Sequence, residues 1–171
     1  MSHAPRSARA CSGSWPTASS VHSGAAGSCT STPRRRSGTY EVRAGLEAHA
    51  ARLAALRTTA EERAEITRWR ERMTSPTVDS LCDRASSNDA FHDTITAASG
   101  NPRLLEMIHA NRLFHFNKRI AALYSPEEIA VTSRQHGDLI TAVCDGDADR
   151  AGETAREHTE YSLEIILKRL F

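Results

Sequence analysis

Residues 125–150 read SPEEIAVTSRQHGDLITAVCDGDADR, and this stretch predicts one complete helix and the beginning of the next. Residues 125–128 combine a serine cap, a first-turn proline and a capping-box glutamate, which together open a helix. Residues 145–147 end that helix at a glycine and cap a second helix, which continues to the C-terminus. Because so short a connection joins two long helices, we expect them to lie antiparallel.

The same kinds of signal divide the preceding sequence into further helices. Thr58 and Glu61 are spaced as a capping box, and Asn101 followed by Pro102 marks a helix start. No run of alternating polar and apolar residues is long enough to predict a strand. The predicted helices span about 40–57, 59–73, 78–98, 102–124, 126–145 and 148–171. The sequence therefore predicts an all-α antiparallel bundle of about six helices.

The composition changes abruptly at Tyr40. Residues 1–39 contain ten serines, and Val21 is their one large aliphatic residue, so they cannot bury enough apolar surface to offset the entropy lost on ordering. They also hold five arginines and no acid, which leaves the rest of the chain mildly acidic under a net charge of +1. We therefore predict a disordered tail over 1–39 and a folded domain over 40–171, without the basic patch that nucleic-acid binding needs.

The four cysteines show no close pairing that would favour a disulfide or a zinc site. They are Cys11, Cys29, Cys82 and Cys144. No stretch approaches the roughly 20 apolar residues of a membrane helix, and the N-terminus lacks the apolar core of a signal peptide. We therefore expect reduced thiols, a cytoplasmic location and no membrane partner.

Three histidines fall on the apolar faces of three different predicted helices: His92, His136 and His158. Burying a histidine costs free energy unless its ring nitrogens find partners. One divalent metal ion could satisfy all three, since neutral imidazole is a favoured ligand. Alternatively, each histidine is a core residue whose ring bonds separately to a backbone carbonyl or a carboxylate. The pattern alone leaves both interpretations open.

Two residues one helical turn before His92 could add an oxygen ligand. Asn88 and Asp89 stand four and three residues before it, and either spacing places both side chains on one helix face. Three nitrogens and one oxygen suit zinc, nickel, manganese or iron. An open position on such a metal could hold the carboxylate of a small acid or activate a water for hydrolysis. No catalytic motif such as HExxH accompanies these residues, so we predict no catalytic residue.

Three groups of residues resemble one known family in their order and spacing. The groups are Tyr40-Glu41-Val42-Arg43 with Leu46-Glu47 and 50–55, then Asn88-Asp89-Ala90-Phe91-His92 with 97–101, and finally His136, Ile140, Ala142, Gly146-Asp147-Ala148, Ala151 and His158. They resemble the FCD (FadR C-terminal) domain, the effector-binding half of GntR-type bacterial transcriptional regulators. The resemblance covers about residues 40–171.

The resemblance implies a helical bundle whose central cavity holds a divalent metal and a small carboxylate effector. Its metal ligands would be Asn88, His92, His136 and His158. Many relatives carry aspartate where this chain has Asn88, and an amide oxygen brings no charge, so Asp89 is an alternative ligand. Some relatives bind their effector without metal. Arg43 would either face the cavity and pair with the effector carboxylate or be an exposed helix arginine.

The resemblance also implies a homodimer that senses a small organic acid for an attached DNA-binding domain. These regulators normally begin with a winged helix-turn-helix, for which residues 1–39 are too short and too rich in Ser, Gly and Arg. We therefore expect a truncated gene, a shifted reading frame or a wrong start site, with DNA binding only through the missing domain. The alternative functions are a metal-dependent enzyme on the same bundle and a metal-free module that only dimerises.

Overall fold

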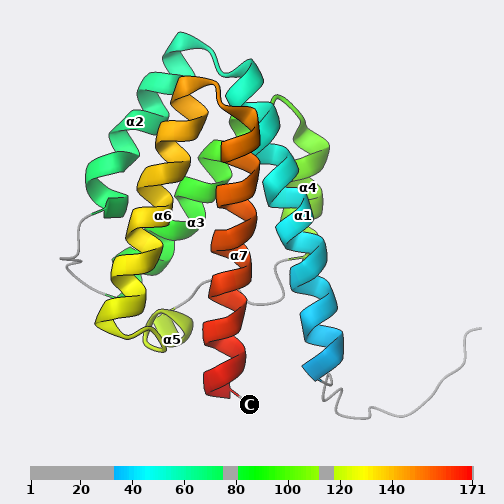
Figure 1. Cartoon of the computed structure of the whole chain (residues 1–171), viewed down its shortest axis with the longest axis vertical. Coiled ribbons are helices and arrows are strands. Elements are labelled where there is room, and N and C mark those ends of the chain that lie inside the picture. Colours follow the sequence, from blue (N-terminus) through cyan, green and yellow to red (C-terminus); the bar gives the residue numbers. More distant parts are fainter. Residues whose placement is uncertain (1–32, 75–80, 112–117, 171) are drawn as a thin grey trace, which may run out of the picture. The chain divides into compact units, whose positions relative to one another are not determined.

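The computed structural model describes residues 33–74, 81–111 and 118–170 of the 171-residue chain (Figure 1). Its helices are α1 (Pro33–Arg57), α2 (Ala60–Thr74), α3 (Leu81–Ala98), α4 (Pro102–Asn111), α5 (Lys118–Ala121), α6 (Pro126–Asp145) and α7 (Ala148–Leu170). No strand occurs within these three ranges. The predicted all-α bundle is therefore confirmed.

Helix α7 packs along α1 on one side and along α6 on the other (Figure 1). Helix α2 covers the far side of α6, and α3 contacts both α1 and α2. Helices α6 and α7 run in opposite directions, as the short connection between them predicted. Helices α1, α6 and α7 thus lie side by side, and α2 and α3 pack against them.

Both ends of α6 show the capping interactions that the sequence predicted. The Glu128 N–H donates to Ser125 Oγ at 3.3 Å, and the Ser125 N–H donates to Glu128 Oε2 at 2.8 Å, which completes the predicted capping box. At the other end, Gly146 adopts the left-handed conformation with φ of 76°, and its N–H bonds back to the Val143 carbonyl. Glycine takes this conformation at little steric cost, so α6 stops where predicted.

The capping box of α2 lies one residue later than predicted. The Glu62 N–H donates to Thr59 Oγ1 at 3.2 Å and the Thr59 N–H donates to Glu62 Oε2 at 2.9 Å, so the assignment to Thr58 and Glu61 was wrong. The Thr58 N–H still donates to the Ala54 carbonyl at 2.9 Å, within the last turn of α1. Because Thr58 belongs to the end of α1, the next residue becomes the cap of α2.

Two other helix boundaries differ from the prediction. Helix α1 begins at Pro33 rather than Tyr40, and a proline suits the first helical position because its missing N–H would have no partner there. The predicted helix over 102–124 corresponds to α4 and the short α5, while 112–117 lie outside the described residues. The predicted tail up to residue 32 and the first residues of the helix predicted from 78 also lie outside them.

Apolar side chains form two main clusters around the centre of the bundle. The large cluster joins α1, α2, α3, α6 and α7, and its bulkiest fully buried members are Ile66, Phe91, Leu139 and Ile140. The small cluster comprises Ile120, Tyr124, Ile165 and Ile166. Along α7, the buried face passes from alanines of the large cluster, through a polar stretch at 158–159, to isoleucines of the small cluster. The two clusters therefore lie on opposite sides of a polar layer.

Candidate metal and effector site

Buried polar side chains gather in the layer between the two apolar clusters. They come from α1, α3, α6 and α7 and are Glu47, Ser87, Asn88, His92, Thr132, Ser133, His136, His158 and Thr159. Removing so many polar groups from water costs free energy unless each finds a partner. A layer of this kind is more typical of a ligand site than of simple core packing.

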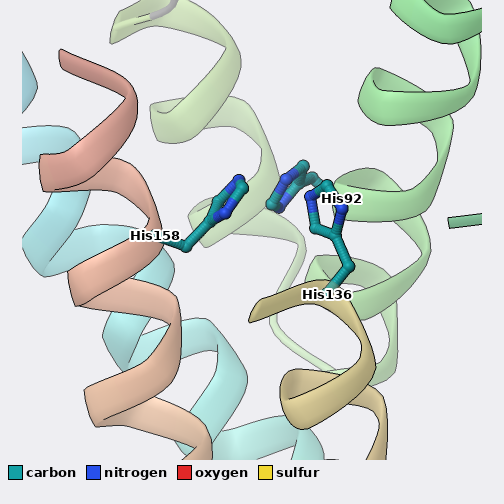
Figure 2. Close-up of side chains that lie close together, drawn as sticks. All are labelled: His92, His136 and His158. Carbon is teal, nitrogen blue, oxygen red and sulfur yellow. The ribbon is translucent and has the colours of Figure 1, made fainter. Parts of the chain in front are cut away.

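The three predicted histidines converge in this layer. Figure 2 shows their rings pointing toward one another from α3, α6 and α7. The His136 and His158 ring centroids are 4.4 Å apart, and His92 lies 5.0 Å from His158 and 5.4 Å from His136. One nitrogen from each ring can be chosen so that all three lie within 4.8 Å of one another. The structure thus brings the three candidate side chains together at one point in the bundle.

The donor set fits a divalent metal ion. With metal–nitrogen bonds of roughly 2.0–2.1 Å, two ligand nitrogens lie at most about 4.2 Å apart, so the three nitrogens, now within 4.8 Å of one another, would move closer together on binding a metal. Among the described residues, His136 Nε2 is buried and has no hydrogen-bond partner. An unsatisfied buried nitrogen costs about 1–3 kcal/mol, and coordination would remove that cost.

Each ring also has a partner outside the cluster. His158 Nδ1 donates to Gln135 Oε1 at 3.1 Å, and His92 Nδ1 lies 3.7 Å from Glu47 Oε2. The backbone of Met73 holds the His136 ring. Metal-binding histidines typically give one ring N–H to a carboxylate, amide or carbonyl, which orients the other nitrogen toward the ion. This arrangement thus resembles a supported metal centre.

Burial keeps the histidines neutral, the form that binds metal. Desolvation lowers the pKa of His136 well below its ordinary value, and the neighbouring His158, His92 and Arg84 lower it further. Desolvation likewise lowers the pKa of His158 to about 4, although the Glu47 carboxylate opposes that change. At neutral pH both rings therefore offer a lone pair.

The two predicted oxygen ligands differ in their surroundings. Asn88 is buried on α3, one helical turn before His92, and so lies in the polar layer. Asp89 is half-buried, and the cluster of possible ligands found among the described residues contains the three histidines without it. Asn88 therefore stays the predicted fourth ligand and Asp89 the alternative.

Arg43 is held in the layer by a buried carboxylate. Its Nε donates to Glu47 Oε1 at 2.6 Å, and its side chain is only 15% exposed. The other oxygen, Glu47 Oε2, accepts from Thr159 Oγ1 at 3.1 Å and connects α1 to α7. The alternative of an exposed helix arginine is therefore wrong.

Comparison with known proteins places the chain in a family. The FCD domain profile matches residues 39–161, a span that includes Arg43 and all the predicted metal ligands. The chain therefore belongs to the FCD domain family, the effector-binding regulatory domains of GntR-type transcription regulators. A search of curated protein sequences gave no match. None of the described helices is long and apolar enough to cross a membrane.

Three residues that act on the histidine cluster were not predicted from the sequence as site residues. Glu47 and Gln135 support the histidines, and Arg84 carries a charge that acts on His136. Helical spacing could have found two of them, since Glu47 stands four residues after Arg43 and Arg84 stands four before Asn88. Gln135 gave no signal, because it directly precedes His136 but contacts a histidine on another helix.

Proposed function

We propose that this domain senses a small organic acid with the help of one divalent metal ion. His92, His136 and His158 would bind the metal, with the Asn88 amide oxygen as a fourth ligand. The convergence of three buried histidines carries the proposal, because a shared cation is the partner that satisfies all three rings at once. Zinc, nickel, manganese and iron all accept such a donor set.

The bound metal would supply a Lewis-acidic position for a carboxylate oxygen of the effector. Arg43 would then add a planar, charged donor that suits a carboxylate. Its pairing with Glu47 supports this role, because the carboxylate holds the guanidinium at the layer and limits its motion. The proposed effector is thus a small organic acid whose carboxylate would bind both the metal and Arg43.

Sensing accounts for this layer better than catalysis. A hydrolytic site needs a base free to take a proton from metal-bound water. Glu47, a carboxylate that contacts the histidine cluster, already accepts hydrogen bonds from Arg43 and Thr159. In the regulator, we expect a homodimer in which effector binding acts on an attached DNA-binding domain, the part that would contact DNA.

Metal analysis of the purified full chain tests this function. We expect about one metal ion per chain, and we expect His136→Ala to weaken zinc or nickel binding by roughly 100-fold or more. His109→Ala is the matched control, since His109 is about half exposed and lies away from the cluster. A native protein that holds no metal, and gains no thermal stability from zinc or nickel, would contradict the proposal.

A further inference from the structure

Arg84 lies on the inward face of α3. It stands four residues before Asn88, seven before Phe91 and eleven before Ile95, and these spacings place all four on one helical stripe. Phe91 and Ile95 on that stripe are buried in the large cluster. The half-buried Arg84 side chain therefore starts from the buried face, roughly 6 Å along the axis from Asn88.

Arg84 lies close enough to the polar layer to interact with its residues. Its charge acts on His136, a member of the metal cluster, and on Tyr124, which is buried in the small cluster. One turn further along α3, the Ser87 hydroxyl is buried, and no hydrogen-bond partner for it exists among the described residues. Arg84 and Ser87 thus provide donors on the side of the histidines that faces the small cluster.

The two arginines of the layer differ in their charge balance. Glu47 neutralises Arg43 at 2.6 Å. Within residues 33–74, 81–111 and 118–170, no carboxylate pairs with Arg84. A guanidinium keeps its charge in proteins even where burial lowers its pKa, as burial does for Arg84. A half-buried cation that no described carboxylate balances is costly, so the described part of the layer lacks an anion at this point.

We propose that Arg84 receives a second carboxylate of the effector, so that the ligand is a dicarboxylic acid. One carboxylate would lie at the histidine cluster and Arg43, and the other would pair with the fork of donors on Arg84. The Ser87 hydroxyl would donate a further hydrogen bond to that second group. This inference rests on the proposed acid-sensing function and narrows its ligand class.

Matched diacids and mono-amides test the inference. Succinate, glutarate and adipate are compared with succinamate, glutaramate and adipamate, which keep the shape and lose one charge. Calorimetry on the metal-loaded full chain should show at least one diacid binding roughly 10- to 100-fold more tightly than its mono-amide. Arg84→Gln should remove that preference.

Two further variants keep the test decisive. Arg103→Gln alters an arginine that is 82% exposed and should change nothing. Arg84→Lys keeps the charge and should retain part of the preference even if Arg84→Gln folds poorly. Equal affinity of wild-type protein for each diacid and its mono-amide, or an unchanged preference in Arg84→Gln, would overturn the inference alone. A protein that binds metal but none of the six acids would contradict acid sensing itself.

Discussion

The His158 ring illustrates how single residues define this site. Its Nδ1–H is given to Gln135 Oε1 at 3.1 Å, so the lone pair lies on Nε2. The ring is buried and comes from a different helix than Gln135. Gln135 therefore selects the tautomer in which Nε2 can bind a cation.

Gln135→Leu should weaken zinc binding by roughly 10- to 100-fold, because the His158 tautomer and ring orientation would lose their support. Competition titration measures the affinity, and long-range proton–nitrogen NMR reports which ring nitrogen carries the proton. Gln135→Glu keeps the acceptor and should bind zinc about as tightly as wild type. Arg134→Gln, at an exposed neighbouring position, is the control. Unchanged affinity in Gln135→Leu would show that Gln135 does not position His158.

The sequence predicted residue positions correctly where the periodicity of a single helix determines which side chains point inward. His92, His136 and His158 fall on apolar stripes, and helical periodicity was enough to turn all three inward. It could not find the pairing of Glu47 with Thr159, which are 112 residues apart, because such contacts depend on how α1 packs on α7. Partners of this kind are products of tertiary structure.

At the scale of elements, small side chains determine how closely α1 and α7 approach. Small buried residues recur along both helices, and they include Ala44, Ala48, Ala51 and Ala55 on α1 and Ala151, Gly152 and Ala155 on α7. A Cβ at Gly152 would lie 3.2 Å from the Ala48 carbonyl oxygen and 2.5 Å from Cγ of Arg52. A Cβ at Gly45 would have no described atom within 4 Å.

These two helical glycines should respond differently to alanine. Gly45→Ala should raise the free energy of unfolding by about 1 kcal/mol, because alanine has the higher helix propensity and nothing described opposes it. Gly152→Ala should give no gain or a loss, because Arg52 and the Ala48 backbone must move. Urea unfolding of both variants measures the difference. An equal gain at both positions would contradict the close packing of α1 on α7.

Helix ends were predictable to different degrees for a physical reason. The α6 boundaries depend on local cap and glycine geometry within a few residues, and both were right. The predicted cap of α2 was wrong by one residue because Thr58 can either end α1 or cap α2. Its N–H donates to the Ala54 carbonyl, so it belongs to the last turn of α1 and Thr59 becomes the cap. Two adjacent threonines look alike until the preceding helix has been placed.

At the scale of the whole molecule, the polar layer makes stability depend on pH. The pKa of His158 is lowered to about 4 in the folded protein from an ordinary 6.5, so the unfolded chain binds more protons between these values. The contribution of His158 to the free energy of unfolding is therefore fully present above about pH 6.5, and it is lost as the pH falls toward 4. His136 contributes in the same direction, since its pKa is also lowered.

Metal-free protein should accordingly lose about 2 kcal/mol of unfolding free energy between pH 6.5 and 5 through His158 alone. Chelator-treated samples unfolded in urea at a series of pH values give this slope. His158→Gln should reduce it, whereas His49→Gln, at an exposed position, should not. A slope that is the same in wild type and His158→Gln would show that this ring is not buried in its neutral form.

The family could be inferred from the sequence because the order and spacing of Arg43, Asn88 and the three histidines extend over most of the domain. The FCD profile match to residues 39–161 confirms that inference. The ligand class could not be inferred in the same way. It depends on which charges α1, α3 and α7 leave unbalanced in the layer, and Arg84 becomes informative only when Arg43 is seen to be paired.

Cobalt substitution tests the central claim most directly, because the visible spectrum of Co²⁺ reports its ligands. The full chain loaded with Co²⁺ should show protein-dependent absorption bands that are lost in His136→Ala. The bands should shift when a diacid such as glutarate is added, as a carboxylate oxygen enters the coordination sphere. The absence of any protein-dependent band, or bands that no organic acid alters, would contradict a histidine-bound metal that serves as the effector site.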